Sequence, residues 1–345
     1  MKALYQKYKL LFKRPAGTSR GILHHKETFF IKIEKEGKTG YGEAALFRGL
    51  SADDGPDYEQ KLQWTVQNIH LPKTELFDRL KNFSSIIFGL EQAFASLSAQ
   101  TPHLLYPSDF TEGKKNIPIN GLIWMGKKSF MFNQIKEKIE QGFRVIKLKI
   151  GAIDFQDELD LLKYIRREFS PSEIEIRVDA NGAFQPDEAL EKLKKLSDYQ
   201  IHSIEQPIRQ GQLKNMAKLC KLSPLPIALD EELIGYPTDF DKISFLKQVR
   251  PQYIILKPAL HGGFTGTNSW IQAAEKLQIG WWITSALESN IGLNAIAQFT
   301  AQKNIKIPQG LGTGALFTNN FSSPLYIDKG TLHYQPNKKL QLPIF

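Results

Sequence analysis

Charged side chains recur at a regular interval through the middle of the chain. Each one closes a short apolar segment, and successive positions are 25 to 30 residues apart: Lys149, Asp179, Glu205, Asp230 and Lys257. A β/α unit takes about 30 residues, so these side chains would stand at one height on successive strands. The spacing therefore predicts a cluster of charged groups at the C-terminal ends of parallel strands, where barrel enzymes carry out their chemistry.

The three carboxylates in this set predict a site for a hard divalent cation. Carboxylates that are buried together repel one another and are costly to desolvate, and a bound cation relieves both costs. The candidate ligands are Asp179, Glu205 and Asp230. Oxygen ligands suit Mg²⁺, Mn²⁺ or Ca²⁺, and the sequence has no cluster of Cys and His that would indicate zinc.

Lysines flank the carboxylates on both sides. Lys147 and Lys149 alternate with Leu148, so both side chains point to one face of their strand. Two inward lysines would be very unfavourable in an ordinary buried strand. Near a metal and partly buried, a lysine has a depressed pKa and can act as a neutral base. The arrangement suits removal of a proton next to a carboxylate while the metal holds the enediolate.

Each of these residues, taken alone, is more often a helix cap or a solvated loop residue. Their recurrence is what indicates function. Two acidic groups, 53–54 and 154–160, are instead expected to be solvated, and His261 is expected to be a loop or surface residue.

The elements that would position the charged residues are eight short apolar segments. Amphipathic helical patterns lie between several of them. The strand candidates are 117–125, 144–151, 173–182, 202–207, 226–231, 253–258, 281–287 and 309–313. This alternation favours an α/β fold with a β/α barrel, and an open doubly wound sheet is the alternative.

A smaller α+β domain is expected ahead of the barrel. Residues 28–46 alternate like a hairpin that turns at 36–38, and residues 57–100 have helical periodicity. We therefore place the domain limits at 1–116 for the α+β domain and 117–322 for the barrel. The tail, residues 323–345, is expected to return to the first domain.

The composition argues against nucleic acid and membrane partners. The net charge is +9, but the lysines are mixed with acids and form no basic block or Gly-rich phosphate loop. No apolar run approaches the roughly 18 residues of a membrane span. The single cysteine excludes an intrachain disulfide and fits a reducing cytoplasm. The sequence does not indicate an oligomeric state.

Five motifs, in this order, resemble the muconate-lactonizing-enzyme subgroup of the enolase superfamily: KLKIG, VDANGAF, IEQPI, ALDEE and ILKPALHGG. The resemblance covers roughly residues 117–313, and GYGEAA at 40–45 resembles the end of that family's capping-domain sheet. It implies a (β/α)7β TIM-like barrel with an α+β N-terminal capping domain. It also implies Mg²⁺ as the usual metal, with Mn²⁺ possible.

The resemblance assigns roles by position. The implied metal ligands are Asp179, Glu205 and Asp230, and the implied acid/base residues are Lys149 and Lys257. Supporting or substrate-binding roles are expected for Lys147, Asn181, Glu231, Ser285 and Gly312.

Within the subgroup, SALESNIGL (285–293) is similar to the segment of members that dehydrate a cyclic dicarboxylate. This implies a lyase with a small anionic dicarboxylate as its substrate. Mandelate-racemase-like members carry a His where this chain has Ser285, which disfavours that branch. Gly312 and Gly314 stand where dipeptide epimerases carry two Asp residues for the substrate ammonium.

Three alternatives stay open. A dipeptide epimerase or a cycloisomerase would also use both lysines, and a catalytically silent binding barrel is the alternative of another class. Two capping-domain loops, 14–22 and 46–54, are expected to set substrate identity. Arg20 and Arg48 in these loops are candidate partners for a substrate carboxylate, with surface roles as the alternative.

Overall fold

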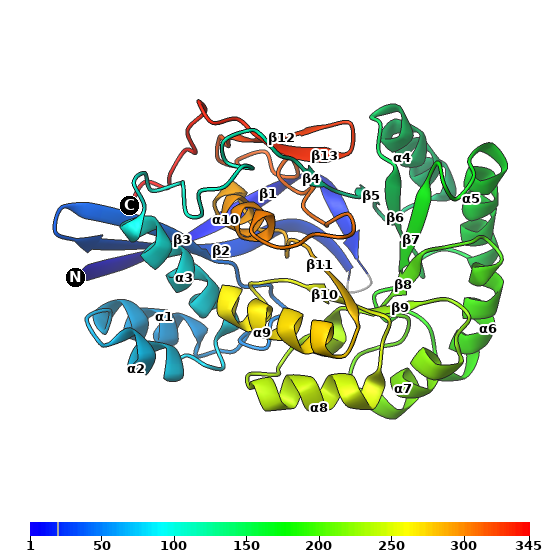
Figure 1. Ribbon diagram of the computed structural model, residues 1–345, viewed down its shortest axis with the longest axis horizontal. Helices are drawn as coiled ribbons and strands as arrows, with labels where there is room; N and C mark the ends of the chain where they lie inside the picture. The colour runs from blue at the N-terminus through cyan, green and yellow to red at the C-terminus, as the bar shows by residue number, and fades with distance from the viewer. Residues whose placement is uncertain (19–20) are drawn as a thin grey trace.

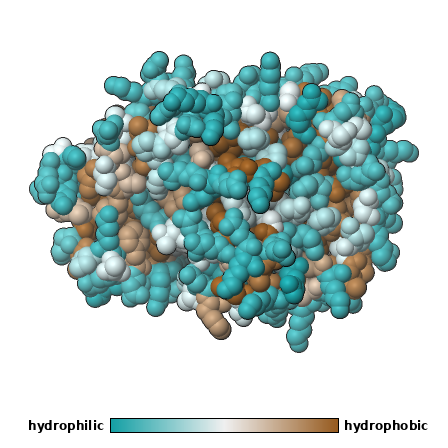
Figure 2. All heavy atoms as spheres, in the orientation of Figure 1, coloured by the Kyte–Doolittle hydropathy of each residue, from teal (hydrophilic) through white to brown (hydrophobic). Residues whose placement is uncertain are grey.

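The computed structural model describes residues 1–18 and 21–345. It contains an antiparallel sheet near the N-terminus, a curled parallel sheet ringed by helices, and a small C-terminal sheet (Figure 1). No helix among the described residues is long and apolar enough to cross a membrane. Hydrophilic side chains cover most of the face in Figure 2, and the hydrophobic ones show in separate groups.

The N-terminal sheet has the order β1 (Lys2–Thr18), β2 (Gly21–Lys35) and β3 (Lys38–Ala44). The turn between β2 and β3 lies at Glu36 and Gly37, which both have positive φ, so the predicted hairpin is confirmed. The long β1–β2 hairpin runs from the side of the molecule that carries both termini toward its middle (Figure 1). It thereby brings β1 residues to the barrel.

Helices α1 (Tyr58–Gln67), α2 (Lys73–Asp78) and α3 (Ser84–Ser98) complete the capping domain. Helix α3 packs directly on β3, because Gly42 and Gly89 face each other and a Cβ on either would overlap the other element. This close approach buries a full set of apolar sheet residues, and each such side chain contributes about 1.5–3 kcal/mol when buried.

The parallel sheet contains seven strands in sequence order. They are β5 (Gly121–Ile123), β6 (Val145–Lys149), β7 (Glu175–Asp179), β8 (Ser203–Glu205), β9 (Ile227–Leu229), β10 (Tyr253–Leu256) and β11 (Gly280–Ile283). The predicted eighth strand, 309–313, is reduced to two parallel bridges, Gln309 with Ile119 and Gly310 with Thr284. These bridges lie between β11 and the segment that precedes β5, so they close the ring and the predicted barrel is confirmed.

Helices cover the outside of the barrel (Figure 1). They are α4 (Lys128–Glu140), α5 (Phe155–Glu168), α6 (Pro186–Ser197), α7 (Leu213–Leu222), α8 (Asp239–Val249), α9 (Gly263–Lys276) and α10 (Asn290–Ala301). Helix α6 begins where Pro186 predicts, and a capping box between Gln185 and Glu188 satisfies its first N–H groups. Helix α10 is buried along almost its whole length, since it lies between the barrel and the capping domain.

The predicted strand 117–125 is interrupted, and its first residues pair with the tail. The first two residues form β4 (Ile117–Pro118), which pairs with β13 (Thr331–Tyr334), and β13 pairs with β12 (Leu325–Asp328). The tail strands thus join the start of the barrel. Further along the tail, Leu340 packs with Phe30 of the N-terminal sheet, and the Phe345 ring lies 6.2 Å from that of Tyr41. The domain limits stay a prediction.

Candidate active site

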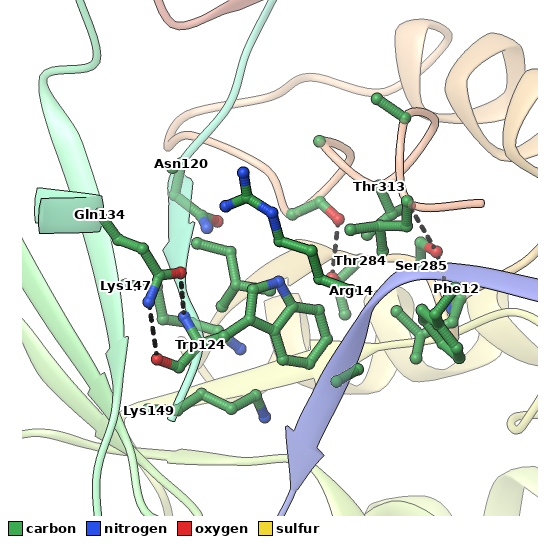
Figure 3. Close-up of a pocket in the computed structure, with 18 of the residues that line it drawn as sticks. Phe12, Arg14, Asn120, Trp124, Gln134, Lys147, Lys149, Thr284, Ser285 and Thr313 are labelled. Atoms are coloured by element: carbon green, nitrogen blue, oxygen red, sulfur yellow. Dashed lines mark hydrogen bonds between the residues drawn. The ribbon is translucent and has the colours of Figure 1, made fainter. Parts of the chain in front are cut away.

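A cavity of about 420 Å³ opens at the C-terminal ends of the barrel strands (Figure 3). Its floor is made by charged residues of the strand ends. We call six residues the floor: Lys147, Lys149, Asp179, Glu205, Asp230 and Lys257. The three lysines and Glu205 line the cavity, and the two aspartates are fully buried behind the lysines that pair with them. Its wall on the capping-domain side is the rim, which we define as Phe12, Arg14, Phe47, Leu50 and Trp124.

The strand register brings the first half of the floor together. Lys149 is paired with Asp179, and Asp179 with Glu205, across β6, β7 and β8. The parallel register therefore places these three residues at one height, as their spacing predicts. The carboxylates of Asp179, Glu205 and Asp230 are almost completely buried, with 0%, 2% and 0% of each residue exposed.

The ammonium groups of β6 hold the carboxylates in a fixed network. Lys147 Nζ lies 2.9 Å from Asp179 Oδ2 and 2.7 Å from Glu205 Oε2. Lys149 Nζ donates to the same Asp179 oxygen at 2.9 Å and to Asn181 Oδ1 at 2.6 Å. Asn181 in turn donates to Glu231 Oε1 at 3.1 Å. Asn181 therefore holds the Lys149 ammonium, and Glu231 holds Asn181.

The second half of the floor is centred on Lys257, which follows β10. Its Nζ pairs with Asp230 Oδ2, and its backbone N–H donates to His261 Nδ1 at 3.0 Å. His261 was expected in a loop or at the surface; it lies in the turn 258–262, where only 5% of the residue is exposed. Burial lowers the pKa of His261 to about 3, so its ring is neutral and accepts the Lys257 N–H.

The pKa directions on the floor follow from burial and from the neighbouring charges. Burial raises the pKa of Glu205 well above its usual range, and the nearby Asp179 and Asp230 charges raise it further. Burial also favours the neutral form of Asp179, but Lys147 and Lys149 outweigh it and lower the Asp179 pKa. Glu205 is thus the carboxylate with the greatest need of a further positive charge.

The lysine pKa directions differ from the expectation of a depressed value. Burial lowers the pKa of Lys147 and of Lys257, but the adjacent carboxylates outweigh burial, and both pKa values are raised. The sequence argument assumed that a metal would neutralise the carboxylates. With the lysines paired to them directly, the attraction of the carboxylates decides the direction.

The donor set of the floor fits a hard divalent cation. Three adjacent strands each supply one buried carboxylate, all ligand atoms are oxygens, and Asp230 Oδ1 is buried with no hydrogen-bond partner among the described residues. Among the residues that the structure describes, no group of three or more His, Cys, Asp or Glu side chains is already arranged to hold a metal ion. Lysine ammonium groups lie against the carboxylates instead. The ligand roles stay a prediction.

Ser285 and Gly312 both line the cavity on the side of β11. Ser285 Oγ accepts hydrogen bonds from Leu287 N and from Thr313 Oγ1, each at 2.9 Å, and Figure 3 shows the second of these. Ser285 therefore organises the wall as well as lining it. A Cβ at Gly312 would lie 3.6 Å from the nearest atoms, so there is space beside it, whereas Gly314 does not line the cavity.

Of the two candidate arginines of the capping-domain loops, the structure describes Arg48. Arg48 does not line the cavity and pairs instead with Glu27 at 3.1 Å and Asp54 at 2.7 Å, which is the surface alternative. Arg20 lies outside the described residues. Arg14, which the sequence argument did not single out, extends from β1 into the cavity (Figure 3). Arg14 has no hydrogen bond or ion pair to any residue that the structure describes.

Trp124 is a second rim residue that sequence reasoning missed. It follows β5, and Gln134 of α4 fixes its backbone through two 3.0 Å hydrogen bonds, one to its N–H and one to its carbonyl. For both Arg14 and Trp124, the signal in the sequence is their position within a predicted element rather than a motif. Arg14 lies in the predicted specificity loop, and Trp124 lies near the end of the first predicted barrel strand.

Two acids that were expected to be solvated are buried. Asp53 accepts hydrogen bonds from the N–H of Ser85 at 2.9 Å and from its hydroxyl at 2.7 Å, at the start of α3. Burial raises the pKa of Asp53 to about 6. Glu158 accepts the N–H of Gly151 at 2.5 Å, and burial raises its pKa to about 7. Each carboxylate stabilises the backbone by accepting its N–H groups. A run of acids in the sequence does not show which of them turns inward in this way.

The chain is similar along most of its length to proteins of known activity. Residues 131–337 match the family described as enolase C-terminal domain-like. An o-succinylbenzoate synthase from Desulfotalea psychrophila (strain LSv54 / DSM 12343) is 46% identical over 96% of this chain and 98% of that protein. An L-Ala-D/L-Glu epimerase from Bacillus subtilis (strain 168) is 28% identical over 84% of this chain and 81% of its own. The crystal structure of MenC from Desulfotalea psychrophila LSv54 matches with a TM-score of 0.86 at 42% identity, covering 96% of this chain and 99% of the other.

Proposed function

The chain belongs to the enolase C-terminal domain-like family, and we propose that within it the chain works as an o-succinylbenzoate synthase. The reaction is the dehydration of 2-succinyl-6-hydroxy-2,4-cyclohexadiene-1-carboxylate to 2-succinylbenzoate in menaquinone biosynthesis. The observation that carries this proposal is the near full-length likeness to a synthase at 46% identity. The charged floor supports it, because the reaction begins with loss of a proton next to a carboxylate.

Lys149 is the base in this proposal. It removes the proton next to the ring carboxylate, and the electron pair moves into that carboxylate as an enediolate. The ring C–O bond then breaks, and the departing hydroxide takes the proton back from Lys149 and leaves as water. One base is sufficient, because the proton and the hydroxide leave from one face of the ring. Lys257, four strands away in the sheet order, stabilises the enediolate charge from the opposite side.

Asp179, Glu205 and Asp230 would hold Mg²⁺, or Mn²⁺ in its place. When bound, the cation supplies positive charge beside the substrate carboxylate and competes with the lysines for the ligand carboxylates. Lys147 positions Asp179 and Glu205, and Asn181 positions the Lys149 ammonium. The substrate is a small anionic dicarboxylate, and the net charge of +9 favours its approach. We place the enzyme in the cytoplasm, without a nucleic acid or membrane partner.

Dipeptide epimerisation is the second candidate, because lysines on two sides of the pocket could also transfer a proton across a substrate. The 28% identity to an L-Ala-D/L-Glu epimerase favours it. The absence of an acid at Gly312 argues against it, since a dipeptide ammonium would have no partner there. A silent binding barrel has no use for three buried carboxylates and three lysines in one pocket.

Specificity constants separate these candidates. The purified protein with Mg²⁺ is assayed with the cyclohexadiene and with a panel of L-Ala-L-Glu-like dipeptides. We expect dehydration to be the faster reaction. Dipeptide epimerisation faster than dehydration would overturn the assignment to the synthase. Inactivity toward every substrate together with no bound metal would favour the silent barrel.

A further inference from the structure

Two glutamates of the capping domain reach across to the barrel and cap the N-termini of two of its helices. Glu43 of β3 meets the start of α10, and Glu91 of α3 meets the start of α9. In each case the carboxylate accepts backbone N–H groups that have no partner within their own helix. The two helices follow the neighbouring strands β11 and β10, but only the segment that leads into α10 lines the substrate pocket.

Glu43 is fully buried and accepts four hydrogen bonds. Oε1 accepts from Ser289 N at 3.0 Å and from Thr28 Oγ1 at 2.8 Å. Oε2 accepts from Ser289 Oγ at 2.6 Å and from Gly292 N at 2.9 Å. Gly292 makes room for this carboxylate, because a Cβ there would lie 2.9 Å from Glu43 Oε2. Both carboxylate oxygens are therefore committed to holding the start of α10.

Glu91 makes the same kind of contact at a different place. It accepts the N–H groups of Phe264 and Thr265 at the start of α9, and Gly263 makes room for it. Its surroundings line a separate cavity of about 970 Å³ between the capping domain and α9. The turn 258–262 separates its contacts from Lys257. Glu91 is thus a natural comparison for Glu43, with matched chemistry but no contact near the substrate pocket.

The segment between β11 and α10 is a part of the pocket wall that needs outside support. Leu287, which lines the pocket, has φ 62°, a left-handed conformation that is strained for a branched side chain. Ser285 Oγ holds the N–H of Leu287 from one side. Ser289, two residues further on, is held by both oxygens of Glu43. The strained turn is therefore clamped between the pocket and the capping domain.

We propose that Glu43 is a positioning residue for substrate binding, which acts by fixing the wall segment 285–289 through the start of α10. Glu91 docks the same domain on the barrel without reaching this wall. The assay for this inference rests on the proposed dehydration. Glu43 touches neither the floor nor the reacting atoms, so its loss should weaken the binding of the substrate and leave the chemical step largely unchanged.

The test compares Glu43→Gln with Glu91→Gln. An amide keeps the shape of the side chain but turns one acceptor into a donor that faces N–H groups, which leaves buried donors unsatisfied. For E43Q we expect KM to rise about tenfold with kcat changed less than about threefold. For E91Q we expect a similar loss of stability in denaturant with KM unchanged. Equal KM for the two variants would overturn the proposal.

A second variant and a measurement without substrate test the role of Glu43 even if E43Q does not fold or the assay fails. Gly292→Ala retains the Glu43 carboxylate, but its Cβ would lie 2.9 Å from Glu43 Oε2 and 2.9 Å from Cβ and Cγ of Glu288 in the wall segment. It should therefore raise KM in the same direction even where E43Q does not fold. Amide hydrogen exchange of 285–289 in the ligand-free protein needs no substrate. Faster exchange in E43Q than in E91Q is expected, and equal exchange contradicts the inference. If wild-type protein does not turn over the cyclohexadiene, the proposed function fails, and hydrogen exchange alone decides on Glu43.

Discussion

The floor and the rim of the pocket are built in different ways. The floor comes from five consecutive strands of one parallel sheet, and its carboxylates are buried and paired with lysines that are 11 to 13% exposed. The rim comes from β1, from the loop after β3 and from the end of β5, and it ranges from buried Phe47 to exposed Arg14. The shared register of a sheet fixes the relative heights of these charges, whereas the separate elements of the rim can vary independently.

This difference suggests that the floor carries out the reaction and that the rim selects the substrate. The reacting atoms need groups whose positions are held by a rigid sheet and by one another. Substrate choice needs side chains that can change without disturbing that sheet. We therefore expect substitutions on the floor to lower kcat and substitutions on the rim to raise KM, and the predictions below test this from the largest effect to the smallest.

The largest effect is expected for Glu205→Gln. This change removes a charge from the carboxylate that lies between the other two and should weaken Mg²⁺ binding and lower kcat/KM by about 1,000-fold or more. Calorimetric metal titration and steady-state rates measure both. Glu175→Gln, at the opposite end of the barrel on β7, is the control and should keep both. Normal activity of the Glu205 variant would remove this residue from the metal site.

The next effect is expected for Lys149→Ala. Loss of the base should lower kcat by roughly 100- to 10,000-fold, since that is the usual contribution of a positioned proton acceptor. The metal should still bind, because the three carboxylates remain. Single-turnover rates and metal content measure this. Should Lys257→Ala lose turnover while Lys149→Ala keeps it, the roles of the two lysines would have to be exchanged.

A smaller effect is expected on the rim, for Arg14→Met. Arg14 is a cation in the pocket without a partner among the described residues, so we expect it to bind the succinyl carboxylate of the substrate. Its loss should raise KM about tenfold with little change in kcat. Arg48→Met is the matched control, because Arg48 is already neutralised by Glu27 and Asp54 outside the pocket. A larger fall in kcat than rise in KM for Arg14→Met would contradict the division between floor and rim.

The sequence predicted the floor better than the rim for a physical reason. Strand ends in a parallel sheet recur with the β/α unit, so the spacing of Lys149, Asp179, Glu205 and Asp230 already places them together. The barrel was predicted from the alternation of strands and helices, and the family from the resemblance of five motifs; both predictions are confirmed. The catalytic and ligand roles of these residues stay predictions.

The rim and the buried acids depend on packing between distant segments, which spacing does not encode. Arg14 reaches the pocket only because the β1–β2 hairpin crosses to the barrel. Asp53 and Glu158 were wrongly expected to be solvated, because one acid in a polar run can turn inward to cap a neighbouring N–H group. His261 lies in a turn, one of its two expected places, and its burial was not foreseen because its partner is the backbone of Lys257.

The most direct test of the floor is the rate at which the wild-type protein forms 2-succinylbenzoate with Mg²⁺ and with excess chelator. Aromatic product is followed by its ultraviolet absorbance from the cyclohexadiene. The account predicts turnover with Mg²⁺, its loss in chelator, and its return when Mg²⁺ or Mn²⁺ is added back. Undiminished turnover in excess chelator, or no turnover with either metal, would contradict it.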